Sequence, residues 1–231
     1  MDYQEIYEQL RQGHPSRAEF HTDDGRGGRV TYTRSFIPPQ RLILLGGGHI
    51  SLALCRFASE LDFAVTVTDD RPSFANAARF PGAERVLCDS FPSAIETLRI
   101  GPYDSVAVLT RGHRWDADCL RTLFAGEQPG YLGMIGSRRR VAGLFGLLRE
   151  EGFDPALMES VHTPIGLEIG AVTPKEIAVS ILAELIACRR RERRRDTLLE
   201  QEDADLELLA GLARADRPLA VAVGGRKTGS T

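Results

Sequence analysis

The spacing of hydrophobic and polar positions changes repeatedly between two patterns along most of this chain. Short apolar runs typical of buried strands occur near residues 42–45, 64–68, 84–87, 105–109 and 131–135. Between them lie segments in which apolar residues recur every three or four positions, as in amphipathic helices. These segments cover residues 50–61, 92–99, 116–125 and 138–150. Strands that alternate with helices predict an α/β protein with a Rossmann-like, doubly wound parallel sheet and helices on both faces.

The segments before and after this region do not continue the alternation of strands and helices. Residues 1–40 predict a short amphipathic helix around Ile6, then a hairpin about a glycine-rich turn, and a proline linker. Further along, Thr173 and Glu176 form a capping box, which predicts the start of another amphipathic helix. Beyond that helix the sequence predicts a charged, helical tail. The predicted divisions are therefore residues 1–40, 41–190 and 191–231.

Composition narrows the class of protein. The 231 residues, of which 42% are hydrophobic, suffice for one packed domain with short appended segments. A net charge of −3 gives no general attraction to nucleic acid or acidic membranes. The arginine-rich run at residues 189–195 is interpreted as solvated, at the negative end of the preceding helix. The first residues lack a signal-peptide pattern, and no apolar run has the length of a membrane span. We expect a cytoplasmic protein that binds neither nucleic acid nor a membrane.

The cysteines do not point to a metal site or a disulfide framework. The chain has four of them, and none forms a C-x-x-C pair. Small apolar packing is the usual role of a cysteine in a helix or at a strand end. We therefore expect free, buried thiols at Cys55, Cys88, Cys119 and Cys188.

A glycine triplet follows the first strand of the alternating region. Gly46 and Gly48 permit a tight turn in which backbone N–H groups approach an anionic ligand, and Ser51 stands where a dinucleotide-binding fingerprint has its third glycine. About twenty residues later come Asp69 and Asp70, where a ribose hydroxyl would be held. The alternative is a structural turn and a solvated strand end. We favour nucleotide-like binding.

Two further junctions follow predicted strands and carry polar side chains. In the first, Gly112 makes a turn and His113 follows it, either as a ligand contact or as a loop histidine. Asp116 is predicted as the N-cap of the next helix. In the second, Gly136 and Ser137 precede the next helix.

That helix begins with three arginines, Arg138 to Arg140, which oppose the positive end of the helix dipole. A bound anion would make this placement favourable, because arginine binds phosphate through two hydrogen bonds. The alternative, that the side chains point into solvent, remains for Arg139 or Arg140.

A last loop, residues 162–170, precedes the capped helix and is rich in proline and glycine. His162 and Glu168 could form an acid–base pair there, although structural packing is the favoured interpretation for both. Loops of this kind near a binding edge often close over a ligand.

Taken together, the motifs GGGHIS, DDRPSFANAARFP, LTRGHRWDADCL, YLGMIGSRR and HTPIGLEIGAVTPKEIAVSILAE closely resemble the XdhC/CoxI family of xanthine dehydrogenase accessory proteins. The resemblance covers approximately residues 36–190. It implies a Rossmann-like domain in a chaperone that binds the molybdenum cofactor, as the pterin or its nucleotide form. It further implies that this protein assists sulfuration with a cysteine desulfurase and delivers the cofactor to a xanthine dehydrogenase-type apoenzyme. No catalytic residue and no metal ligand are implied.

The resemblance also implies where the cofactor binds. It places the phosphate or nucleotide against Gly46, Gly48 and His49, within a cofactor-binding set that also contains Ser51, Asp69, Asp70, Arg71, Gly112, His113, Gly136, Ser137 and Arg138. The first forty residues do not resemble the N-terminal module of the family, which carries a cysteine implicated in cofactor binding. Residues 218–231 faintly resemble the opening of that module, as in a permuted or shortened relative.

Two other classes remain open. In an NAD-dependent oxidoreductase, Asp69 would bind the adenosine ribose. The only lysines are Lys175 and Lys227, so a lysine-based hydride-transfer site is hard to build, whereas one based on His113 is not excluded. A nucleotide-sensing regulatory domain needs only the fold and a partner surface. Homodimerisation is a further prediction.

Overall fold

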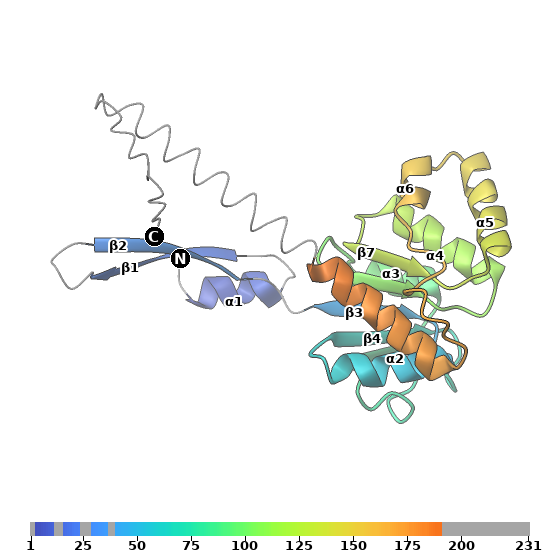
Figure 1. The fold of residues 1–231 in the computed structure, drawn as a ribbon, viewed down its shortest axis with the longest axis horizontal. Helices are drawn as coiled ribbons and strands as arrows, with labels where there is room; N and C mark the ends of the chain where they lie inside the picture. The colour runs from blue at the N-terminus through green and yellow to red at the C-terminus, as the bar shows by residue number, and fades with distance from the viewer. Residues whose placement is uncertain (1–2, 12–15, 24–28, 37–39, 191–231) are drawn as a thin grey trace, which may run out of the picture. The chain divides into compact units, whose positions relative to one another are not determined.

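The computed structural model describes residues 3–11, 16–23, 29–36 and 40–190. These residues form two parts, an N-terminal helix with a hairpin and an α/β domain (Figure 1). The predicted charged tail, residues 191–231, lies outside the described residues.

The N-terminal part consists of α1 (Tyr3–Arg11), β1 (Ser16–Asp23) and β2 (Arg29–Phe36). The two strands pair antiparallel, so the predicted hairpin is confirmed. Aromatic rings join the elements, because the ring of Phe20 lies 6.4 Å from that of Tyr3 in α1 and 6.4 Å from that of Phe36 in β2. Ile6 and Ala18 are buried, which gives this part a small apolar centre.

The sheet of the α/β domain is parallel and has the order β5-β4-β3-β6-β7. Its strands are β3 (Arg41–Leu45), β4 (Ala64–Asp69), β5 (Arg85–Cys88), β6 (Ser105–Val108) and β7 (Tyr131–Met134). The chain runs outward from β3 to β5 and then returns to place β6 on the other side of β3. The strand order therefore reverses between β3 and β6, and open α/β sheets bind ligands at such a point, beyond the carboxyl ends of the strands.

Helices flank this sheet, as the sequence predicted (Figure 1). They are α2 (His49–Ser59), α3 (Phe91–Leu98), α4 (His113–Ala125), α5 (Arg138–Glu150) and the short α6 (Pro155–Glu159). A last helix begins at residue 174 and continues to residue 190 within the described part. The right-handed connections of a parallel sheet place α2 on one face, and α3 and α4 on the other.

Strand β3 shows why this sheet needs helices on both faces. Ile43 and Leu45 belong to an apolar cluster with residues of α3, α4 and α5, whereas Leu42 and Leu44, which point to the opposite face, are also fully buried. Burying one such side chain contributes roughly 1.5–3 kcal/mol. The continuous apolar runs of the sequence follow from this burial on two sides.

Some details differ from the sequence predictions. Helix α4 begins at His113 rather than near residue 116, and α6 was not predicted. Cys55 and Cys119 are buried as expected, and burial raises the pKa of the Cys55 thiol to about 11. The prediction of a buried Cys88 is wrong: β5 is an edge strand, so its last residue is exposed. Among the described residues, no helix combines the length and apolarity needed to cross a membrane.

Candidate functional site

The glycine triplet connects β3 to α2 at the point where the strand order reverses. Gly46 has φ +119°, and its N–H donates to the carbonyl oxygen of Thr68 at 2.8 Å. A Cβ atom on Gly46 would lie 2.5 Å from the carbonyl oxygen of Leu109, and one on Gly47 would lie 2.4 Å from that of Phe74. The backbone of two neighbouring loops therefore contacts these glycines so closely that the fold itself requires both.

Gly48 is the glycine that faces open space. A Cβ atom added there would meet nothing within 4 Å. Gly48 is also the N-cap of α2, and it supplies no side-chain acceptor for the first N–H groups of that helix. The first turn of α2 contains no acidic residue, and His49 is exposed. Uncapped N–H groups at a helix start form a site for an anion, so this end of α2 has the geometry of a phosphate-binding turn.

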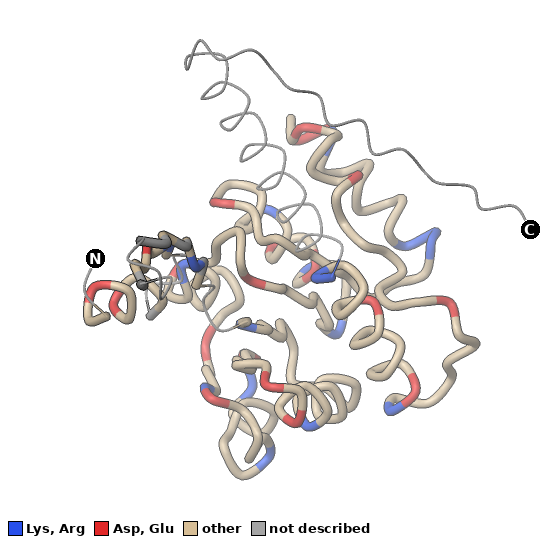
Figure 2. Tube along the Cα trace, turned by 60° about the vertical axis from the view of Figure 1, so that its left-hand side comes forward, with Lys and Arg blue, Asp and Glu red and all other residues tan. Residues whose placement is uncertain are grey.

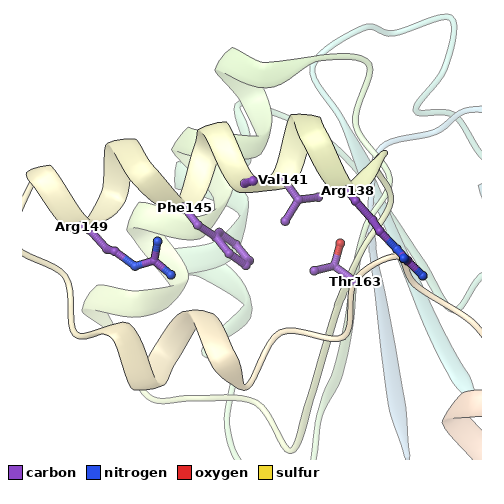
Figure 3. Close-up of a pocket in the computed structure, with 6 residues that line it drawn as sticks. Arg138, Val141, Phe145, Arg149 and Thr163 are labelled. Atoms are coloured by element: carbon purple, nitrogen blue, oxygen red, sulfur yellow. The ribbon is translucent and has the colours of Figure 1, made fainter.

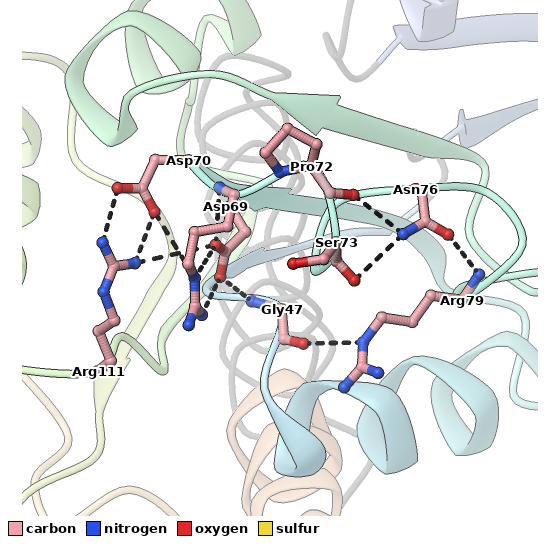
Figure 4. A network of polar contacts seen from close by, with 9 residues as sticks. Gly47, Asp69, Asp70, Pro72, Ser73, Asn76, Arg79 and Arg111 are labelled. Atoms are coloured by element: carbon pink, nitrogen blue, oxygen red, sulfur yellow. Dashed lines mark hydrogen bonds and ion pairs between the residues drawn. The ribbon is translucent and has the colours of Figure 1, made fainter.

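Asp69 fixes the glycine loop from β4. Its side chain is only 1% exposed and accepts hydrogen bonds from the N–H of Gly47 at 2.8 Å and from Arg71 Nε and Nη2 at 2.8 and 3.0 Å (Figure 4). Both carboxylate oxygens are therefore engaged within the protein. The structure gives Asp69 a positioning role, which the sequence alone did not indicate.

Asp70 points away from Asp69 and binds Arg111, from the loop after β6, through two hydrogen bonds of 2.6 and 2.8 Å (Figure 4). The hydrogen bonding to Arg111 lowers the pKa of Asp70 to about 2. The guanidinium of Arg111 lies over the ring of Trp115, 3.9 Å from its centroid, and that of Arg71 lies 3.6 Å from the centroid of Phe74. Two ring-stacked arginines thus bring positive charge to the loops after β4 and β6.

Buried polar atoms without partners gather around the same loop. Arg79 Nε donates to the carbonyl oxygen of Gly47 at 3.2 Å, but its Nη2 is buried and has no hydrogen-bond partner among the described residues. The same holds, within residues 40–190, for the hydroxyls of Ser51 in the first turn of α2 and Thr68 at the end of β4. Buried groups of this kind are rare in proteins and call for a ligand, a water or a functional reason.

The loop after β6 is tied to α5. Thr110 Oγ1 donates to Asp116 Oδ1 at 2.5 Å, and Arg140 donates to the other carboxylate oxygen. The predicted capping role of Asp116 is wrong, because α4 begins three residues earlier with Gly112 as its N-cap. Asp116 is instead a buried carboxylate that joins the loop after β6 to α5. The interpretation that Arg140 points into solvent is therefore wrong, because its guanidinium binds Asp116.

The other predicted residues lie nearer β7. His113 is exposed and lines a pocket of about 310 Å³ between α4 and α5. Ser137 is the N-cap of α5, where its Oγ accepts from the N–H of Arg140 at 3.4 Å. Gly136 precedes it, and a Cβ atom there would lie 3.0 Å from Val141. Arg138 lines a groove along α5. Gly136, Ser137 and Arg138 follow β7, and in the sheet β6 lies between β7 and the strand that precedes the glycine loop.

His162 lies beside the carboxylate of Glu184 and not beside that of Glu168, with which the sequence suggested a pair. Its Nδ1 lies 3.3 Å from Glu184 Oε1, and Glu184 Oε2 accepts from the hydroxyl of Tyr131 at 2.6 Å and from the N–H of Gly166 at 2.8 Å. Glu168 is exposed. Glu184 therefore joins β7, the loop of residues 162–170 and the last helix. For His162 this is the packing role that the sequence favoured.

Sequence reasoning did not single out Gly47, Arg79, Arg111 or Glu184. Arg79 and Arg111 lie within two of the motifs on which the family resemblance rests, and this was a signal that they matter. Their partners, Gly47 and Asp70, are distant in the chain, so spacing alone did not reveal the contacts. Figure 2 shows acidic and basic residues interspersed along the described trace. The described residues contain no group of three or more His, Cys, Asp or Glu side chains that could hold a metal ion.

Comparisons with known proteins agree with this architecture. A family model for the XdhC Rossmann domain matches residues 42–185. The uncharacterised protein YqeB of Escherichia coli K12 is 38% identical over 148 residues, or 63% of this chain and 27% of that protein. A protein of Bacillus subtilis 168 that is named as a probable subunit of xanthine dehydrogenase is 33% identical over 154 residues, or 67% of this chain and 44% of that protein.

The fold agrees as well. A solved structure described as a xanthine dehydrogenase from Bacillus halodurans superimposes with a TM-score of 0.69 at 26% identity, covering 83% of this chain and 67% of that one. The matched region spans less than half the length of the two curated relatives. The chain belongs to the XdhC family, whose Rossmann domain it contains.

Proposed function

We propose that this protein binds the molybdenum cofactor, as the pterin or its nucleotide form, at the glycine loop and hands it to a xanthine dehydrogenase-type apoenzyme. The family supports the accessory role, and the name of one relative connects it with xanthine dehydrogenase. A cysteine desulfurase as sulfur donor, and a second copy of the chain as partner, belong to the same proposal. The bound cargo supplies the redox chemistry, which takes place in the hydroxylase.

The observation that carries the proposal is the open approach to Gly48. Around it lie the first N–H groups of α2, which no side chain caps. The Arg79 Nη2 and the Ser51 hydroxyl are also close to this loop, and both are buried without a partner among the described residues. N–H and guanidinium donors suit the oxygens of a phosphate. The residues present therefore fit a phosphate-bearing cofactor.

This chain's own residues would bind and shield rather than react. The N–H groups that follow Gly48 would hold the phosphate, and Arg111, kept in place by Asp70 and Trp115, would supply a positive charge beside it. Orientation and exclusion of water are what a labile cofactor needs from its carrier. The proposal assigns no proton transfer or covalent step to any side chain.

Asp69 separates this proposal from an NAD-dependent oxidoreductase. A dinucleotide-binding domain uses an acid at this position to accept hydrogen bonds from ribose. Here a ribose would have to compete with Gly47 and Arg71, which already engage both oxygens. That engagement counts against recognition of a ribose by Asp69, whether the ribose belongs to NAD or to the nucleotide form of the cofactor, and it favours a ligand recognised through its phosphate.

The test is to purify the protein from a molybdenum-replete host, denature it and analyse the released small molecules. We expect oxidised pterin fluorescence and no adenine dinucleotide by mass spectrometry. Dinucleotide without pterin would replace the proposal with an oxidoreductase or a nucleotide sensor, and the absence of both would contradict binding by this chain alone.

A pair of glycine variants locates the site. Gly48→Val places a side chain where the phosphate would lie, so we expect loss of bound pterin with an unchanged melting curve. Gly146→Val is the matched control, because Gly146 on α5 also has no atom within 4 Å of an added Cβ. Equal pterin content in the two variants would contradict the assignment to the glycine loop.

A further inference from the structure

A groove of about 270 Å³ runs along α5, on the β7 side of the domain (Figure 3). One face of α5 supplies most of its lining, and the segment after α6 supplies the opposite wall. The lining residues are Arg138, Val141, Ala142, Phe145, Arg149 and Thr163. None of them belongs to the site proposed at the glycine loop. Arg138, which the family resemblance included among the cofactor-binding residues, lines this groove.

Positive charge at the ends and an apolar middle characterise this groove. Arg138 and Arg149 lie eleven residues apart on α5, about 16 Å along the helix axis, with Phe145 between them (Figure 3). Neither guanidinium group has an ion pair or hydrogen bond with any part of the chain that the structure describes. By contrast, Arg111 and Arg121 each bind a carboxylate through two hydrogen bonds.

Thr163 adds a polar group opposite the helix. Its Oγ1 is buried and has no hydrogen-bond partner among the described residues, and Figure 3 shows it pointing toward α5. The groove therefore offers two guanidinium groups without partners and an aromatic surface, and the Thr163 hydroxyl lies buried in the wall opposite the helix. No acidic side chain lines it.

Size and spacing indicate the kind of ligand. The volume lies at the lower end of the roughly 300–1,000 Å³ of pockets that enclose small molecules. Two guanidinium groups at opposite ends of the groove favour an elongated ligand with an acidic group at each end. In an extended peptide, every second side chain lies on the same face, and the first and fifth residues are about 13 Å apart. The flexible ends of arginine and glutamate cover the remaining difference. An acid, an apolar residue and an acid at alternate positions would therefore match Arg138, Phe145 and Arg149.

We propose that the α5 groove is a docking site for an extended acidic segment of a partner protein, with acidic, apolar and acidic side chains at alternate positions. The charges at its two ends set the register of the segment, and the apolar side chain packs on Phe145. This inference does not depend on which ligand binds at the glycine loop.

The test is a titration of the full chain with a synthetic peptide of sequence glutamate–serine–leucine–serine–glutamate, acetylated and amidated, followed by amide chemical shifts. We expect shifts confined to α5 and residues near Thr163, weakening with added salt. Arg138→Gln and Arg149→Gln should each weaken binding roughly fivefold, as expected for one partly exposed ion pair. Phe145→Ala should weaken it by a similar factor.

Arg139→Gln is the matched control, because it removes the same charge from the same helix without touching the groove. We expect it to change the affinity less than twofold, and Gly48→Val to leave it unchanged. The proposal is overturned if the peptide does not bind, if Arg139→Gln weakens binding as much as Arg149→Gln, or if a peptide with lysine for glutamate binds equally well. Shifts that depend on protein concentration without peptide would assign the groove to a second copy instead.

Discussion

Arginines are used in opposite ways at the glycine loop and along α5. At the loop, Arg71 and Arg111 are held by Asp69 and Asp70 and lie over aromatic rings, so their positions are fixed by the fold. Along α5, the guanidinium groups of Arg138 and Arg149 have no partner among the described residues. A fixed guanidinium suits a rigid site that receives one ligand in one orientation, because little side-chain entropy is lost on binding. A guanidinium without a carboxylate partner in its own chain remains available to pair with an acidic group of another molecule.

The largest effect should come from the backbone of the glycine loop. Gly46→Ala forces a Cβ atom to within 2.5 Å of the carbonyl oxygen of Leu109 at φ +119°, so we expect a loss of more than about 3 kcal/mol in the free energy of unfolding, or no folding. Gly48→Ala should change that free energy by less than about 1 kcal/mol. Urea denaturation measures both, and similar losses would show that Gly46 and Gly48 do not differ in their importance for folding.

A smaller effect should come from the carboxylate beneath the loop. Asp69→Asn removes the charge that binds Arg71, and one of its side-chain atoms becomes a donor that faces N–H groups. We expect a loss of about 2 kcal/mol, because a buried group is left with mismatched partners. Asp70→Asn should cost less than about 1 kcal/mol, since that pair is partly exposed. Equal costs measured by urea denaturation would mean that the burial of Asp69 is unimportant.

The smallest effect should be a dependence on pH. Folding lowers the pKa of Asp70 from 3.8 to about 2, so the ionised carboxylate stabilises the fold above pH 4, and this contribution is lost as pH falls from about 4 to 2. The melting temperature of the wild type should therefore fall more across this pH range than that of Asp70→Asn. Arg149→Gln should follow the wild type at every pH, because Arg149 has no described partner. A wild-type slope equal to that of Asp70→Asn would contradict the strong pairing with Arg111.

Much of the architecture could be predicted from local pattern. The parallel sheet, the hairpin and the glycine turn were anticipated because burial on two faces imposes continuous apolar runs, and a tight turn demands glycine. Helix starts were harder to predict, as the assignment of Asp116 shows. From its position in the sequence, Asp116 could be either a helix cap or a buried carboxylate with partners elsewhere in the chain. Only the hydrogen bonds with Thr110 and Arg140 decide between the two.

The candidate site divides in the same way. By itself the sequence determined that Gly46, Gly48 and Asp69 stand at the ends of neighbouring strands, because alternation of strands and helices places such residues at one edge of the sheet. Only the tertiary structure decided that Asp69 holds the loop, that Asp70 binds Arg111 forty-one residues away, and that Arg138 lies in a groove with Arg149. The physical reason is that hydrogen bonds and ion pairs act over a few ångströms in space, and spacing along the chain does not reveal which side chains come that close.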